Sequence, residues 1–136
     1  MKGYRKMSKS LIYMVNSNTQ SVANGGTVNF GNIVRRYGCN CQSNGNTPVV
    51  NGTGYYDIDT NITLTGAAGT VVLTLYKDGV AIPGASQSAT LTADTVTAFN
   101  ISAPIRIKCC CDSTITLVIS GVATAVSNAA IEVKKD

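Results

Sequence analysis

Apolar and polar residues alternate along much of the chain, a period of two that is typical of half-buried β-strands. In segment 56–64 the even positions are tyrosine, isoleucine, threonine or leucine, whereas Asp57, Asp59 and Asn61 occupy odd positions. A helix with about 3.6 residues per turn would mix these two sets on every face. We therefore predict a strand at 56–64, and similar patterns predict strands at 11–15, 28–34, 71–76, 97–101, 105–107, 114–119 and 131–133.

Residues that favour tight turns separate these segments. The turn candidates are Asn24-Gly25-Gly26, Asn44-Gly45, Asn51-Gly52, Lys77-Asp78-Gly79 and Pro83-Gly84, of which 77–79 is the best hairpin signal. Pro104 indicates a strand start or an edge strand. For 123–130 we prefer a loop between the last strands, although one helical turn also fits. Together these short strands predict a single all-β sandwich or barrel.

Composition excludes several function classes. The chain has 136 residues, of which 44% are hydrophobic and 13% charged, so it can bury a core and is neither a coiled coil nor disordered. It contains no histidine, which excludes a Ser-His-Asp triad, a Cys-His pair and histidine metal ligands. The apolar run 11–15 is too short for a signal peptide or a membrane span, so we expect no membrane partner. Met7 is an alternative start.

The net charge of +4 is concentrated at the N-terminus. Lys2, Arg5, Lys6 and Lys9 fall in the first nine residues with no acid among them, which leaves 7 basic against 7 acidic residues elsewhere. We therefore expect a basic arm at 1–9 and one neutral domain at 10–136. The arm fits a flexible tail, an anchor on a larger assembly, or a contact with nucleic acid. A neutral domain argues against the third, because nucleic-acid-binding folds carry basic patches themselves.

The run Gly54-Tyr55-Tyr56-Asp57-Ile58 resembles the glycine-aromatic strand of globular heads in the tumour-necrosis-factor and complement-head superfamily. The aliphatic strand 71–76, the Asp78-Gly79 hairpin and Ile82-Pro83-Gly84 follow it in the same order. The opening 7–13 and the run Cys109-Cys110-Cys111-Asp112 are similar to the bacterial and phage branch, which includes spore-surface glycoprotein heads and small structural proteins of Firmicutes phages and prophages.

This resemblance, over roughly residues 10–135, implies a jelly-roll sandwich of about eight to ten antiparallel strands that forms a compact homotrimer with its termini close together. It implies that aliphatic side chains line the trimer axis, including Val118 and residues near 131–133. It also implies a structural or adhesive role, with no catalysis and no cofactor. The chain lacks a collagen-like stalk, which favours a virion protein attached by a short arm.

We therefore expect a capsid decoration or head-fibre protein on the virion surface of a phage or prophage, assembled in the bacterial cytoplasm. Its expected partners are further copies of itself, a major capsid or other virion protein and, at the polar loops opposite the arm, a cell-surface glycan. Two alternatives stay open. One is a receptor- or glycan-binding head on a tail fibre or spore surface, and the other is a carbohydrate-active enzyme, against which the lack of tryptophan and histidine counts.

Five cysteines form a possible thiol cluster: Cys39, Cys41, Cys109, Cys110 and Cys111. Their spacing is poor for zinc, and their odd number leaves one thiol unpaired within the chain, so unpaired structural thiols are preferred over disulfides or a metal. By parity, Cys109 and Cys111 continue the face of Ile105, whereas Cys110 lies beside basic residues that would favour its thiolate.

The remaining candidates have simpler interpretations. Asp57 and Asp59 would suit a glycosidase or calcium, but a solvated strand face is preferred because the chain has few acids. Sequons begin at Asn51, Asn61 and Asn100, and we expect no glycans there. We interpret Arg35-Arg36-Tyr37 as a solvated turn or a contact point, and Asn24-Gly25-Gly26 as a turn without the spacing of a phosphate loop. No catalytic or metal site is expected.

Overall fold

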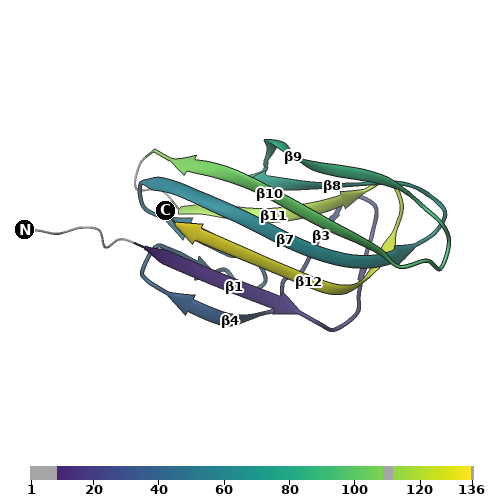
Figure 1. The fold of residues 1–136 in the computed structure, drawn as a ribbon, viewed down its shortest axis with the longest axis horizontal. Coiled ribbons are helices and arrows are strands. Elements are labelled where there is room, and N and C mark those ends of the chain that lie inside the picture. Colours follow the sequence, from purple (N-terminus) through teal and green to yellow (C-terminus); the bar gives the residue numbers. More distant parts are fainter. Residues whose placement is uncertain (1–8, 109–111, 136) are drawn as a thin grey trace, which may run out of the picture.

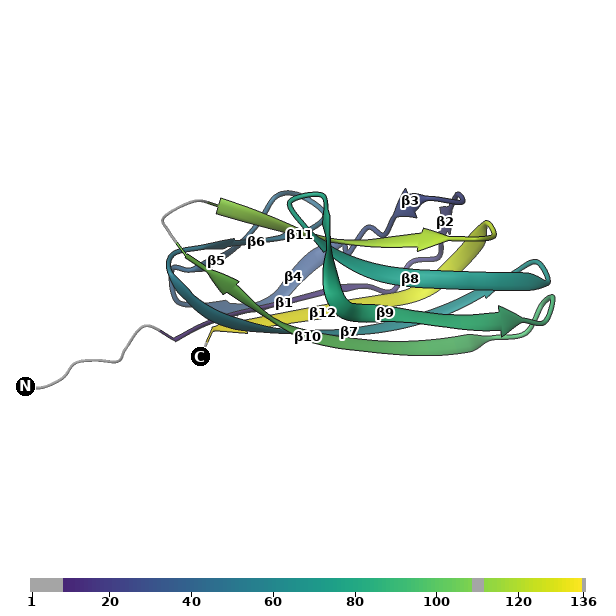
Figure 2. The same cartoon turned by 90° about the horizontal axis from the view of Figure 1, so that it is seen from above.

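The alternating segments form two antiparallel sheets that pack face to face (Figures 1 and 2). The computed structural model describes residues 9–108 and 112–135. Their strands are β1 (Ser10–Asn16), β2 (Gln20–Val22), β3 (Gly26–Thr27), β4 (Asn32–Tyr37), β5 (Cys41–Ser43), β6 (Pro48–Asn51), β7 (Gly54–Gly66), β8 (Gly69–Lys77), β9 (Val80–Leu91), β10 (Thr97–Ile107), β11 (Asp112–Ser120) and β12 (Thr124–Lys135). The all-β sandwich predicted from the period of two is confirmed.

The strand order shows a jelly-roll arrangement, in which most neighbours in a sheet are distant in the sequence. The first sheet has the order β10-β7-β12-β1-β4, with β2 also paired to β12. The second sheet has the order β5-β6-β11-β8-β9, with β3 also paired to β11. Ser10 at the start of β1 is the register partner of Lys135 at the end of β12. The chain therefore enters and leaves the fold at the same end, as the resemblance implied (Figure 1).

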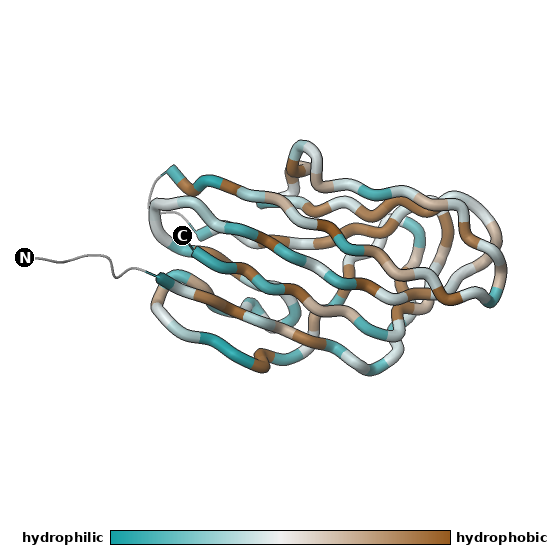
Figure 3. The backbone as a smooth tube through the Cα atoms, viewed as in Figure 1, coloured by the Kyte–Doolittle hydropathy of each residue, from teal (hydrophilic) through white to brown (hydrophobic). Residues whose placement is uncertain are grey.

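The core lies between the sheets and is filled by one side of each strand. In β7, Tyr56, Ile58, Ile62 and Leu64 are buried, whereas the intervening residues face outward. Thr60 shares the inward side, and its hydroxyl donates a hydrogen bond to the Ile101 carbonyl at 2.9 Å, which satisfies a buried polar group. The alternation of hydrophilic and hydrophobic residues is visible along the long strands in Figure 3.

The 77–79 hairpin forms as predicted. Asp78 and Gly79 have φ values of 52° and 80°, the left-handed pair that a two-residue hairpin of type I′ requires. The Asp78 carboxylate accepts a hydrogen bond from the Thr114 amide at 2.9 Å, which ties the hairpin to β11. Pro104 lies in β10, at the edge of the first sheet, where the missing amide hydrogen of a proline is tolerated.

Three local expectations are wrong. The predicted loop 123–130 lies in β12, whose alanines hid the pattern and whose register shifts between Val126 and Asn128. Pro83-Gly84 does not end a strand but forms a bulge inside β9. The predicted strand 28–34 begins only at Asn32. Before it, Val28 and Phe30 fill the core from irregular backbone whose amides bond to Leu117 and Asn46 carbonyls.

The Tyr56 phenol and the Cys41 thiol are buried near each other at the end of the sandwich where the termini lie. The Tyr56 hydroxyl donates to the Gly52 and Asn51 carbonyls at 2.8 and 3.1 Å, and burial raises the pKa of Tyr56 to about 12. Burial also raises the pKa of Cys41 to about 11, although Arg36 and Lys135 act in the opposite direction. Both groups are therefore held neutral in the folded chain.

Because both folded-state pKa values exceed the ordinary values of 10.0 for tyrosine and 9.0 for cysteine, stability should be full below about pH 9 and fall as the pH rises to about 12. Each group contributes a slope of at most about 1.4 kcal/mol per pH unit within its own window. Denaturant unfolding at a series of pH values should show a shallower fall between pH 9 and 11 for Cys41→Ala. The variant Cys39→Ala controls for the loss of a thiol, and equal slopes in both variants would contradict the prediction.

Candidate functional site

The surface of the first sheet that is turned away from the second sheet carries the most distinctive group of side chains, and we call it the outward face. In β1, Leu11, Tyr13 and Val15 point to the outward face and are half-buried, whereas Ile12 and Met14 are fully buried in the core. This separation follows from the period of two in β1. The outward face therefore begins with an apolar stripe along a central strand.

A polar hollow adjoins this stripe. It has a volume of about 390 Å³ and is lined by Tyr13, Asp59, Asn61, Asn100, Ala130 and Glu132, from β1, β7, β10 and β12. The Asn100 side-chain amide donates to the Asn61 side-chain oxygen at 2.6 Å. The Ser102 hydroxyl donates to Asp59. The hollow thus combines amides, a phenol ring and two carboxylates on rigid strands.

The two carboxylates of the hollow, which we call the acidic pair, are Asp59 and Glu132. They are register partners on the neighbouring strands β7 and β12. Like charges directly opposite each other on one face destabilise a sheet. Neither forms an ion pair with a cation among residues 9–108 and 112–135. A group that approaches the outward face with a positive charge or hydrogen-bond donors would relieve this repulsion.

The edge strand β4 extends the outward face with exposed apolar and basic side chains. Tyr37, which is 50% exposed, and Arg35 continue the outward face, whereas Ile33 and Val34, 43% and 59% exposed, lie opposite the inward Met14 and at the register shift. Tyr37 is the register partner of Leu11, and Arg35 is the register partner of Tyr13. Apolar side chains that gather on an exposed sheet edge are typical of an interaction surface. The arrangement suits association with a macromolecule.

The structure places the predicted acidic residues together with residues that the sequence did not single out. Asp57 and Asp59 lie on the outward face of β7, the solvated strand face that we preferred. Glu132 and Tyr13 were missed, because only the pairing of β12 with β7 and β1 brings them beside Asp59. Asn100 was named only as a sequon, and the pairing of β10 with β7 brings it to the hollow. Parity within 131–133 was the available signal, since it turns Glu132 away from the buried Ile131 and Val133.

Of the predicted thiol cluster, Cys39 is exposed and Cys41 is buried, and both are free thiols. The Cys41 sulfur lies 3.8 Å from the Val133 carbonyl oxygen. Cys109, Cys110 and Cys111 lie outside the described residues, so the relation between the two groups of cysteines stays a prediction. No group of three or more histidine, cysteine, aspartate or glutamate side chains in the described part of the chain could hold a metal ion.

The basic residues singled out from the sequence lie in the N-terminal segment and in β4. Lys9 is exposed just before β1, while Lys2, Arg5 and Lys6 lie outside the described residues. The prediction of a turn at 35–37 is wrong, because these residues belong to strand β4, where they are exposed. Arg36 donates through Nε to the Cys41 carbonyl at 2.6 Å, so it fixes the approach to β5, whereas Arg35 stays exposed.

The remaining candidates have structural roles. The Asn51 side-chain amide donates a hydrogen bond to the Asp112 carboxylate at 2.6 Å, and the Asn100 side chain donates one to the Asn61 side chain. Gly25 has a φ of 84° in the predicted turn at 24–26, and its amide donates to the Ile119 carbonyl at 2.7 Å. The described residues contain no helix long and apolar enough to span a membrane.

The residues expected on a trimer axis need a correction. Ile131 and Val133 are fully buried in the core between the sheets, so they cannot contact another copy. Val118 is half-buried on the second sheet, where it pairs with Thr27 and Thr74. These residues therefore do not share one surface. The expectation came from the resemblance and not from the alternation of residues within 131–133.

The comparisons with known proteins define the class of fold. No protein-family model and no curated protein matches the chain. Among solved structures, murine APRIL at pH 5.0 has a TM-score of 0.72 at 15% identity, over 94% of this chain and 99% of APRIL. Vertex protein P5 of phage PRD1 has a TM-score of 0.63 at 15% identity, over 93% and 96% of the two chains.

The globular domain of the zebrafish complement 1qA protein is also similar, with a TM-score of 0.63 at 10% identity over 91% of this chain and 94% of that domain. These similarities span nearly the whole of each chain, so this chain and the three solved structures share the entire jelly-roll fold. The expected similarity to tumour-necrosis-factor and complement heads is thereby confirmed at the level of fold. The phage or prophage origin stays a prediction.

The acidic pair yields a direct prediction. Glu132→Gln should raise the free energy of unfolding by about 0.5 kcal/mol at low ionic strength, because it removes a like-charge contact between β7 and β12. The gain should shrink at high salt, where exposed charges are screened. Urea unfolding at a fixed protein concentration measures it. Asp94→Asn, in the exposed 92–96 turn, is the matched control, and an equal gain in both variants would contradict the assignment.

Proposed function

We propose that this chain is a non-enzymatic structural head of a phage or prophage virion, and that three copies associate through the outward face of the first sheet. The observation that carries the proposal is the similarity of fold, over more than nine-tenths of both chains, to a phage vertex protein as well as to APRIL and a complement head. The resemblance of the sequence to the superfamily implies a homotrimer.

The outward face supports this association physically. Leu11, Tyr13 and Val15 form an apolar stripe that a neighbouring copy would remove from water, at about 25 cal/mol for each Å² buried. Arg35 lies on one side of this stripe and the acidic pair on the other. In a cyclic assembly, the basic side of one copy can approach the acidic side of the next, which would relieve the repulsion within the pair.

The two ends of the head have different roles in this proposal. Because β1 begins at the end of the head where β12 ends, the basic arm 1–9 would lie at that end and would anchor the head on an acidic surface of a capsid or another virion protein. The loops at the opposite end include 17–19, 67–68, 92–96 and 121–123, none of which contains an aromatic residue. Aromatic rings are a usual platform for sugars, so these loops do not favour the glycan-binding alternative over the structural role.

Sedimentation of the purified chain should give a particle of three times the 14.1 kDa chain mass. Tyr13→Glu should shift the protein to monomers, because a buried interface does not tolerate a further unpaired carboxylate next to the acidic pair. Tyr76→Glu is the matched control, since Tyr76 is also half-buried but points outward from the second sheet. A wild-type monomer at all concentrations, or equal dissociation of both variants, would overturn the proposed trimer.

A second prediction concerns the arm. Deletion of residues 1–9 should leave the sedimentation of the trimer unchanged but abolish its attachment to the parent particle, because four of the eleven basic residues are removed. Replacing Lys2, Arg5, Lys6 and Lys9 by glutamine at constant length separates charge from length. Attachment that survives both changes would eliminate the anchor.

A further inference from the structure

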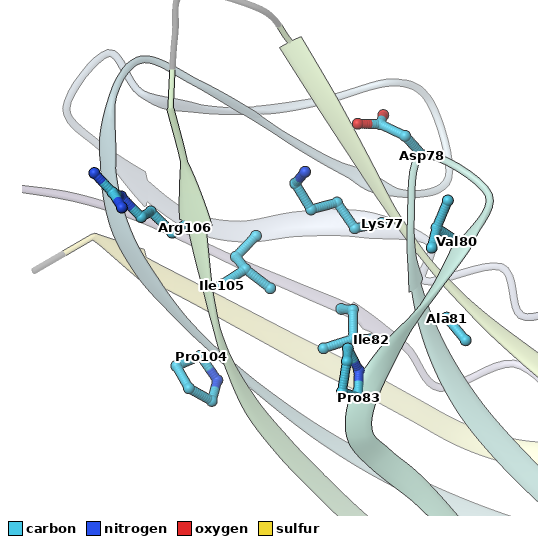
Figure 4. A pocket seen from close by; sticks show the side chains of 9 residues that line it. All are labelled: Lys77, Asp78, Val80, Ala81, Ile82, Pro83, Pro104, Ile105 and Arg106. Carbon is cyan, nitrogen blue, oxygen red and sulfur yellow. The ribbon is translucent and has the colours of Figure 1, made fainter.

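A pocket of about 410 Å³ opens at the edge of the sandwich where β9 and β10 approach each other, and we call it the edge pocket (Figure 4). It lies at the β10 edge of the first sheet, with β7 and β12 between it and the apolar stripe of β1. One wall is the start of β9, with Val80 and Pro83, and the other is the end of β10, with Pro104 and Arg106. Its volume is in the range of sites that hold one or two side chains or a small ligand.

The floor of the edge pocket is aliphatic. Ile82 and Ile105 are 8% and 7% exposed, so these core residues can be reached from outside through the gap between the two edge strands. Val80, which is 70% exposed, extends the apolar surface at the rim. The lining contains no aromatic side chain. An aliphatic side chain is therefore a better fit than a sugar ring, which usually stacks on an aromatic one.

Both walls offer backbone groups that no neighbouring strand uses. The register of β9 with β8 passes from Ala81 directly to Ser86, so the bulge Ile82–Ala85 has no strand partner. β10 is the last strand of the first sheet, and it pairs only with β7. Unpaired backbone along an exposed strand is the feature by which extended peptides add to a sheet.

The orientation of β10 shows which of its groups are free. The Asn100 amide donates to the Gln87 side chain on β9 at 3.3 Å, so the amide of residue 100 points away from β7. Because backbone direction alternates along a strand, residues 102, 104 and 106 point the same way. Pro104 has no amide hydrogen, which leaves the Arg106 amide and nearby carbonyl groups. The free edge can therefore hold a short peptide but not a long ladder.

The charge at the edge pocket is positive. Lys77 has the same parity as the inward Leu73 and Leu75, but it lies at the end of β8, so its half-buried side chain reaches into the pocket between the two walls (Figure 4). Arg106 lies on the rim and packs 5.6 Å from the centre of the Tyr55 ring. The Asp78 carboxylate already accepts the Thr114 amide hydrogen. Neither cation is in an ion pair within the described part of the chain.

We propose that the edge pocket binds an extended peptide segment of a partner protein in which an aliphatic side chain and a carboxylate are two residues apart, so that both point to the same side of the peptide. The aliphatic side chain lies on Ile82 and Ile105, the carboxylate faces Lys77, and the peptide backbone meets the free groups of the bulge and of Arg106. This inference goes beyond the proposed function, because it requires only a folded single chain and involves neither the apolar stripe, the acidic pair nor the basic arm.

Fluorescence anisotropy tests this binding with a labelled, end-blocked six-residue peptide that has leucine at positions 1 and 5, aspartate at position 3 and serine at the other positions, so that leucine and aspartate share one side. The control peptide has asparagine in place of aspartate. The acidic peptide should bind in a saturable way, and its affinity should fall as salt is raised, as expected for a charge-assisted contact. The control peptide should bind at least about threefold more weakly, since one exposed ion pair is lost.

Variants of the protein locate the site. Lys77→Gln should weaken binding of the acidic peptide about threefold, because it keeps the length of the side chain and removes its charge. Val80→Glu should weaken it about tenfold through repulsion and loss of apolar contact. Val96→Glu is the matched control, because Val96 is 63% exposed and lies outside the pocket. It should bind like the wild type.

Three outcomes would overturn the proposal. The first is a lack of saturable binding by the acidic peptide, and the second is equal binding of the two peptides. The third is a Val80→Glu variant that dissociates the oligomer in sedimentation while Val96→Glu does not, because the edge pocket would then be a contact between copies. Failure of the peptide to bind leaves the trimer test with Tyr13→Glu unaffected, so the two proposals fail separately.

Discussion

The fold depends on one constraint, which is the insertion of the last strand, β12, between β1 and β7. β12 pairs with β1 over seven residues, from Ser10 to Asn16, and with β7 along nearly its whole length. Without this strand the first sheet would separate into two parts, and Ile131 and Val133 would leave the centre of the core. The same pairing brings the two ends of the chain together, since Ser10 lies opposite Lys135. A one-residue slip of β12 would turn its buried side chains outward.

That register also determines the surface chemistry of the molecule. It places Glu132 opposite Asp59 on one side and opposite Tyr13 on the other, so an acidic pair and an apolar stripe lie on one rigid sheet face. A basic and apolar site lies at the free edge, where Lys77 stands beside an aliphatic floor between the bulge in β9 and the end of β10. The neutral domain thus presents an apolar and acidic face and a separate apolar and basic edge, which suits contacts with two different protein surfaces.

The sequence predicted the sandwich, most strands and the Asp78-Gly79 hairpin, because each is encoded by local period and turn chemistry. It predicted only the end of β12, at 131–133, because alanines and a bulge at Val126–Asn128 hide the alternation before it, and it did not predict the bulge in β9, whose proline and glycine resemble a turn. Asp59 could be selected as an outward carboxylate from parity alone. Its partners Glu132, Tyr13 and Asn100 are distant in the sequence, and only the order of strands in the sheet brings them together.

The register of β12 builds the outward face, and we propose that further copies of the chain cover this face. Hydroxyl-radical footprinting across a range of protein concentrations tests this claim directly, because Tyr13 and Tyr76 are both half-buried tyrosines on opposite sheets. We expect that oxidation of Tyr13 falls as the concentration rises, while oxidation of Tyr76 stays constant. A Tyr13 that remains equally reactive at every concentration, or a Tyr76 that becomes protected in its place, would contradict it.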